Sequence, residues 1–157
     1  VELPKPADVV ICDSHPADVD MWQANKGITA AGLAVKPGGT IVYITPCWEG
    51  IASEHPDVAK LGYMSFKRIK EVVERGEVKD LSAAAHIAHV GRIIVDKAQC
   101  ILVSEGLSQS EAYRMGFDYA ATPQEAVDKA LEKHGPRARV ALIRKAPELL
   151  PIIREAS

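Results

Sequence analysis

The sequence has few of the features that mark membrane or nucleic-acid-binding proteins. Aromatic residues make up only 5% of its 157 residues, and the formal net charge is -2. Without an excess of positive charge, a protein has no long-range field that attracts phosphate backbones or anionic lipids. The longest apolar runs, such as residues 41–44 and 100–103, fall far short of the roughly 20 residues of a membrane-spanning helix. We therefore expect neither nucleic acid nor a membrane as a partner.

Cysteine is also scarce. Cys12, Cys47 and Cys100 are far apart and odd in number, and no C-x-x-C pair is present. This pattern argues against a disulfide framework and against a structural zinc site. Residues 1–6 lack the charged and apolar regions of a signal peptide and are typical of a linker that follows another segment. We expect a cytoplasmic protein.

Hydrophobic residues make up 47% of the chain, and their spacing alternates between strand and helix periods. The predicted strands are residues 7–12, 40–45, 99–104, 118–121 and 137–144. The predicted helices are residues 18–35, 65–75, 80–97, 108–116, 123–134 and 147–155, with a long loop over 46–63. This order predicts one α/β domain over residues 7–157, in which helices cover both faces of a mainly parallel sheet. In such folds, ligands usually bind beyond the carboxyl ends of the strands.

The first long helix has two distinct faces, because successive side chains turn by about 100° around a helix. Its predicted core stripe consists of Met21, Ala24, Ile28, Ala31 and Val35. Trp22, Gln23 and Lys26 share an arc on the other side. These three side chains either belong to an ordinary solvated surface or form one wall of a cleft that a second domain covers.

Several other residues have two interpretations each. Glu49 could accept hydrogen bonds from a substrate hydroxyl or cap a nearby helix.

His86 and His89 lie on one helix face, opposite a predicted core stripe. That stripe comprises Leu81, Ala84, Ala88, Gly91 and Val95. With no obvious third ligand we predict no metal site and treat His86 as a cleft residue. Cys47 is expected to be a small buried residue in preference to a nucleophile.

The segment P-x-D-x-x-x-W-Q-A-x-K at residues 16–26 resembles a motif in the C-terminal domain of the nickel-dependent lactate racemase family. The resemblance continues in order along nearly the whole chain. It includes Lys36–Ile41, Cys47–Ser53, His86-x-Ala88 with Arg92, and Val103–Ser104 followed by Leu107. Any one of these motifs alone would be weak, but their common order is specific.

The resemblance implies a racemase or epimerase of 2-hydroxy acids that uses a nickel-pincer nucleotide. In that chemistry a base removes the hydroxyl proton while hydride leaves the α-carbon for the cofactor. The family's two catalytic positions on this helix carry over to Gln23 and Lys26, which would hold the substrate and its ketoacid intermediate. Trp22 would shape the pocket, with Glu49 and His86 as further substrate-binding candidates.

The family's cofactor attachment, nickel ligand and catalytic base pair lie in an N-terminal domain to which no part of this sequence corresponds. The resemblance therefore implies that an N-terminal catalytic domain of the same polypeptide is the partner. It also implies that this chain alone holds no cofactor and is inactive.

Two departures from the family leave the substrate open. Asp13-Ser14-His15 stands where the family usually has Gly-Gly-Tyr, and Ile87 replaces the lysine of its His-Lys-Ala segment. Lactate, a longer 2-hydroxy acid or a sugar acid would each fit a Gln and Lys anchor. The alternative is a free-standing α/β module that binds a small anion or a protein without catalysis.

Overall fold

A computed structural model describes residues 1–154 of the chain. Five parallel strands form the main sheet in the order β5-β4-β3-β2-β6. Their bounds are β2 Ala7–Asp13, β3 Val35–Ile44, β4 Gln99–Val103, β5 Asp118–Tyr119 and β6 Val140–Ile143. Two short strands, β1 (Glu2–Leu3) and β7 (Ile152–Ile153), pair in parallel as a separate sheet. The prediction of a parallel α/β fold is confirmed.

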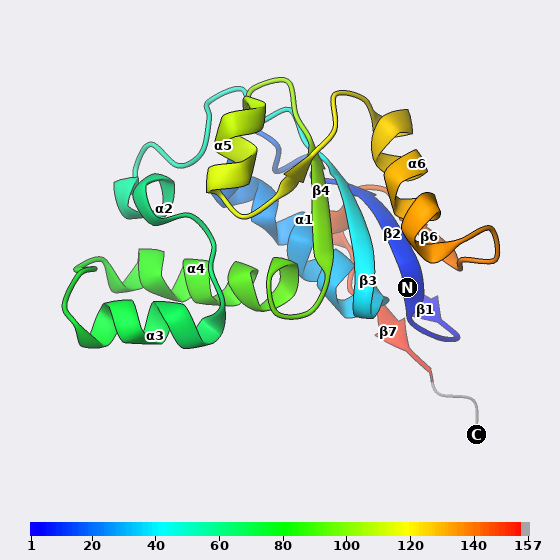
Figure 1. Cartoon of the computed structure of the whole chain (residues 1–157), viewed down its shortest axis with the longest axis horizontal. Coiled ribbons are helices and arrows are strands. Elements are labelled where there is room, and N and C mark those ends of the chain that lie inside the picture. Colours follow the sequence, from blue (N-terminus) through cyan, green and yellow to red (C-terminus); the bar gives the residue numbers. More distant parts are fainter. Residues whose placement is uncertain (155–157) are drawn as a thin grey trace.

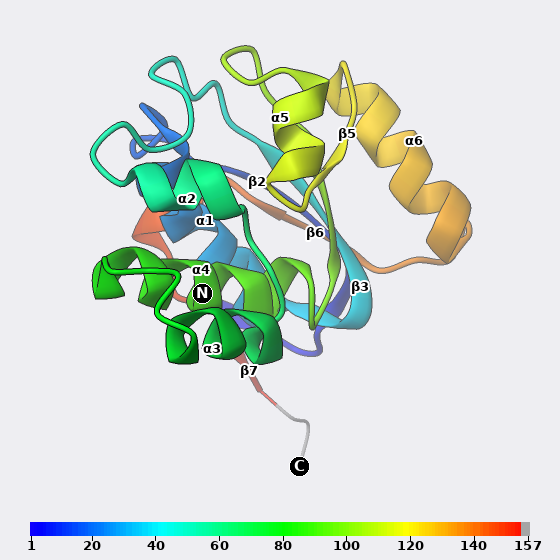
Figure 2. The same cartoon turned by 60° about the vertical axis from the view of Figure 1, so that its left-hand side comes forward.

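Helices cover both faces of the sheet. Their bounds are α1 Met21–Ala34, α2 Pro56–Leu61, α3 Phe66–Glu74, α4 Leu81–Ile94, α5 Gln109–Arg114 and α6 Pro123–His134. Figures 1 and 2 show α6 on one side of the sheet, and α1, α3 and α4 on the other. The two faces are therefore unequal, and the α1 side carries the larger core.

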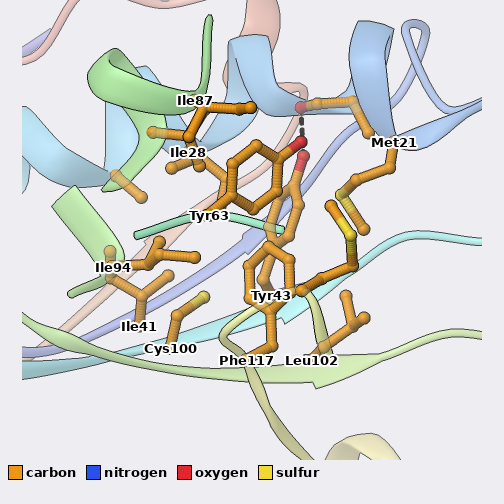
Figure 3. Close-up of a cluster of buried hydrophobic side chains, with 14 of the residues drawn as sticks. Met21, Ile28, Ile41, Tyr43, Tyr63, Ile87, Ile94, Cys100, Leu102 and Phe117 are labelled. Atoms are coloured by element: carbon orange, nitrogen blue, oxygen red, sulfur yellow. Dashed lines mark hydrogen bonds between the residues drawn. The ribbon is translucent and has the colours of Figure 1, made fainter. Parts of the chain in front are cut away.

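Alternation along each strand creates these two cores. In β3, Ile41 and Tyr43 face the larger core, whereas Val42 faces α6. Figure 3 shows the larger core, where Tyr43 lies among apolar side chains from strands and helices. The buried Tyr43 hydroxyl donates to the carbonyl oxygen of Ala24 in α1. This bond ties the helix to the sheet at the turn that follows Trp22.

The predicted core stripe is confirmed, because all five of its residues are fully buried, although Val35 is the first residue of β3 and α1 ends at Ala34. The helix begins at Met21, three residues later than expected, because the Asp20 side chain accepts a hydrogen bond from the Gln23 backbone at 2.7 Å. Ser65, Asp80 and Thr122 likewise cap α3, α4 and α6, as their sequence positions predict.

The predicted C-terminal helix over residues 147–155 is wrong. The chain makes a single 3-10 turn at Ala146–Glu148 and then β7, while residue 155 lies outside the described residues. Pro151 has no backbone N–H and disfavours a helical residue before it. The Ile152 N–H donates to the Val1 carbonyl oxygen at 2.8 Å instead. Residues 1–6, expected as a linker, therefore contribute strand β1.

Two further expectations need correction. The predicted loop over 46–63 contains α2, which begins at Pro56, a residue that suits the first turn of a helix. On α4, Leu81 is 68% and Val95 46% exposed, so the predicted core stripe is displaced. The buried residues of α4 are Ala83, Ala84, Ile87, Val90, Gly91 and Ile94. α1, α2 and α3 all contact α4, and this tertiary arrangement decides which of its sides is covered.

A substitution at Gly91 tests the packing that sets the position of α4. A Cβ at this position would lie 1.8 Å from the Met64 carbonyl oxygen, which cannot move without the backbone. We expect Gly91→Ala to lower the free energy of unfolding by about 2 kcal/mol or more, although alanine favours helix by about 1 kcal/mol. Urea denaturation measures this change. The exposed control Ala85→Gly should cost only about 1 kcal/mol, and an equal or smaller loss in Gly91→Ala would contradict the close approach.

Candidate active-site wall

Gln23 and Lys26 form a joined pair on the outer side of α1. Lys26 is exposed, Gln23 is half-buried, and the Lys26 ammonium donates to Gln23 Oε1 at 2.7 Å. Their spacing of three residues places both side chains on one side of the helix. An ammonium and an amide therefore meet at the surface, as the helix period predicts.

Trp22 lies beside this pair, between two histidine rings. Its ring centroid is 3.7 Å from that of His55 at an interplanar angle of 16°, and 4.0 Å from that of His86 at 21°. His55 directly precedes α2, and His86 belongs to α4. Trp22 is half-buried and is not sealed in the interior. We call the three rings His55, Trp22 and His86 the aromatic stack.

Each histidine of the stack has a polar anchor. His55 Nδ1 lies 2.9 Å from Asp80 Oδ2, and the other carboxylate oxygen of Asp80 accepts the first backbone N–H groups of α4. His86 Nε2 lies 3.0 Å from Asn25 Nδ2 and 3.2 Å from the Tyr63 hydroxyl. The amide of Asn25 also contacts that hydroxyl.

His86 and Tyr63, the more buried groups of this network, are uncharged at pH 7. Burial, together with the nearby His89 and His55, lowers the pKa of His86 to about 4, so its ring is neutral at pH 7. Burial also raises the pKa of Tyr63 far above its usual value. At the outer end, the hydrogen bond from His55 lowers the pKa of Asp80. Lys26 is therefore the cation beside a mostly neutral set of rings and amides.

His89 continues the seam between α1 and α4 but forms no metal site. Its Nε2 lies 2.8 Å from Thr29 Oγ1. Within residues 1–154, no group of three or more His, Cys, Asp or Glu residues could hold a metal ion. A cavity of about 740 Å³ lies further along this seam, and its lining includes Thr29 and His89 but none of Trp22, Gln23 or Lys26. These three residues form an open wall.

The chain matches the family model described as the lactate racemase C-terminal domain over residues 3–148. It belongs to this family. The lactate racemase of Thermoanaerobacterium thermosaccharolyticum is 28% identical to it, and that of Lactiplantibacillus plantarum is 27% identical. Each match covers 82% of this chain and 30% of the relative. The chain therefore spans about a third of the length of the curated relatives it matches.

Solved structures show the same fold. The lactate racemase apoprotein from T. thermosaccharolyticum superposes with a TM-score of 0.76 at 24% identity, covering 96% of this chain and 36% of that one. A Thermotoga maritima protein gives a TM-score of 0.69 at 15% identity, covering 98% of this chain and 39% of that one. Over residues 1–154, no helix reaches the length and apolarity needed to cross a bilayer.

The loop Cys47–Ser53 packs on the start of α1. The carbonyl oxygens of Gly50 and Ile51 accept the backbone N–H groups of Met21 and Trp22, each at 3.0 Å. Asp20 provides the side-chain cap, so Glu49 does not cap α1. The Glu49 side chain is exposed and makes no hydrogen bond within the described part of the chain. Its role in substrate binding stays a prediction.

Cys47, in the same loop, is fully buried with its Sγ 3.2 Å from Thr45 Oγ1. Burial raises the pKa of the thiol to about 11, so the unreactive protonated form dominates at neutral pH. Its interpretation as a small buried residue is confirmed.

The residues that depart from the family's Gly-Gly-Tyr turn join the ends of neighbouring strands. Asp13 Oδ1 accepts the backbone N–H of Lys145 after β6 at 2.7 Å. Ser14 Oγ donates to Thr45 Oγ1 after β3 at 2.6 Å. Both side chains therefore stabilise the carboxyl edge of the sheet.

Sequence reasoning missed four residues of the network: His55, Asn25, Tyr63 and Asp80. The sequence places Asp80 only at the start of the helix predicted over 80–97, and His55 only within the loop predicted over 46–63. One signal was present, because Asn25 is a polar residue four positions after Met21, next to the apolar stripe of α1. The hydrogen-bond partners of Asn25 come from distant segments of the chain, so the helix period could not predict them.

The environment of His86 predicts a pH dependence. Because the folded pKa of about 4 lies below the ordinary value of 6.5, the unfolded chain binds the extra proton more readily between these values. Stability from the neutral ring should be fully present above pH 6.5 and be lost as pH falls toward 4. Histidine NMR signals followed from pH 8 to pH 4 measure this directly. A His86 midpoint at or above the ordinary value of 6.5 would contradict the burial of His86.

Proposed function

We propose that this chain is the substrate-holding domain of a 2-hydroxy acid racemase or epimerase that uses a nickel-pincer nucleotide. The observation that carries the proposal is the Lys26–Gln23 pair, joined at 2.7 Å on an open helix face beside Trp22. Family membership supports it, since the relatives named lactate racemase share this domain. The substrate class is taken as 2-hydroxy acids generally.

Lys26 supplies positive charge where the substrate carries or develops negative charge. Its ammonium would pair with the substrate carboxylate and with the oxygen on C2 as the hydroxyl becomes a carbonyl. Lys26 already holds the oxygen of the Gln23 amide, which leaves the amide NH2 group to donate to a substrate oxygen. Together, a charge and a directional donor would fix the orientation of a small hydroxy acid.

Within residues 1–154 no cluster of His, Cys, Asp or Glu residues could hold a metal ion, so the proposal assigns the cofactor to another domain of the complete polypeptide. When bound there, the nucleotide would accept hydride from the substrate's α-carbon. The open wall formed by Trp22, Gln23 and Lys26 fits this arrangement, because a second surface is needed to exclude water from a substrate. The free cysteines, all buried, are in keeping with the cytoplasmic location that the sequence predicts.

Lys26→Ala in the complete, cofactor-loaded polypeptide tests the proposal. Assayed on a panel of chiral 2-hydroxy acids, this variant should lose about 100-fold or more in kcat/KM, because the developing charge loses its cation. Gln23→Ala should lose about 10-fold, the equivalent of one hydrogen bond.

Lys67→Ala is the matched control, since Lys67 is an exposed lysine on α3, away from the wall. Its turnover should equal that of the parent. Unchanged turnover in Lys26→Ala would refute the assigned role. If the parent isomerises no member of the panel but binds small anions through Lys26, the chain is a binding module without catalysis.

A further inference from the structure

The aromatic stack brings together three segments that lie far apart in the sequence. Trp22 comes from α1, His55 from the residue before α2, and His86 from α4. Ring separations of 3.7 and 4.0 Å are contact distances, so an imidazole covers each face of the indole. A ligand can therefore meet Trp22 only at the edge of its ring.

Asp80 fixes the outer ring of the stack. One of its carboxylate oxygens accepts the backbone N–H groups of Ser82 and Ala83, and the other bonds His55 Nδ1 at 2.9 Å. The carboxylate thus links the first turn of α4 to the His55 ring. On the opposite side, Asn25 and Tyr63 hold His86. The two histidine rings that cover the indole are therefore held by hydrogen bonds within the chain, without any ligand.

The exposed edge of Trp22 includes its N–H group. Within residues 1–154, the buried side-chain polar atom that lacks a partner is Asn25 Oδ1, and the Trp22 indole nitrogen makes no hydrogen bond to protein. That N–H therefore reaches solvent. Gln23 and Lys26 follow on the same helix, where the Lys26 ammonium donates to Gln23 Oε1 at 2.7 Å.

We propose that Asp80 and His55 are positioning residues that hold Trp22 edge-on, so that its indole N–H donates to an oxygen of the substrate bound by Lys26 and Gln23. This inference rests on the proposed function. A ring held between two others loses little freedom when a ligand arrives, which is the physical advantage of preorganised donors. Such a wall favours an oxygen atom at this point over an apolar or aromatic group, since the indole faces are already occupied.

The stack can be tested in this chain without any assay of activity. Trp22 and Trp48 are its two tryptophans, and Trp48 is 67% exposed, so Trp48→Phe leaves Trp22 as the single tryptophan, which can be excited selectively over the four tyrosines. In that background, His55→Ala should shift the emission to longer wavelength and increase quenching by acrylamide. His55→Phe, which restores a ring on the indole, should return both properties toward the parent.

His15→Ala is the matched control for fluorescence. His15 also pairs with an aspartate, Asp18 at 3.4 Å, but its side chain is exposed, and the histidines that stack on Trp22 within residues 1–154 are His55 and His86. His15→Ala should leave the emission unchanged. A spectrum and quenching in His55→Ala identical to the parent would overturn the stack. Circular dichroism verifies that each variant remains folded.

The positioning role is tested in the complete, cofactor-loaded polypeptide. His55→Ala and Asp80→Ser should raise KM about 10-fold with a smaller change in kcat, through the loss of one well-aligned hydrogen bond. Serine is a strong helix cap, so Asp80→Ser keeps the start of α4 while removing the carboxylate that holds His55. Trp22→Phe, which keeps a ring but lacks the N–H, should raise KM similarly, and His55→Phe should recover most of the parent value.

The outcomes separate the two proposals. A changed Trp22 spectrum together with unchanged KM in His55→Ala and Asp80→Ser would overturn the positioning role and leave the proposed function intact. Full turnover in Lys26→Ala would overturn the proposed function itself, whatever the spectra show.

Discussion

The burial of one side of α1 against the sheet is the constraint on which the rest of the structure depends. Met21 and Ile28 are fully buried, and Tyr43 of β3 donates to the carbonyl oxygen of Ala24. Side chains advance by about 100° per residue, so fixing this apolar side also fixes where the opposite side points. Trp22 and Lys26 therefore owe their directions to the buried residues on the other side of the helix.

The sheet places this wall at the usual ligand-binding edge of a parallel α/β fold. α1 follows the carboxyl end of β2, and its first turn therefore lies at that edge. The loop after β3 accepts the first N–H groups of α1 through Gly50 and Ile51. Strand ends, loop and helix start are thus joined by backbone hydrogen bonds, which keeps the donors of the wall at fixed positions.

Few charged side chains lie on the wall, so the positive charge of Lys26 determines how the wall would interact with an ion. His86 is neutral at pH 7 because burial lowers its pKa to about 4, and the carboxylate of Asp80 is engaged by His55 and by the start of α4. The side of α1 formed by Trp22, Gln23 and Lys26 therefore carries one ammonium group, close to the neutral ring of His86.

The sequence by itself determined the order of the five main strands with α1, α3, α4, α5 and α6, the apolar stripe of α1, the helix starts near Ser65, Asp80 and Thr122, and the shared side of the helix on which Gln23 and Lys26 lie. These features are set by local period and by short-range hydrogen bonds. Only the tertiary structure decided that His55 and His86 enclose Trp22, which side of α4 is buried, and that the end of the chain pairs with β1. Those contacts join segments tens of residues or more apart, and a local period carries no information about which distant side chain will fill the space beside a ring.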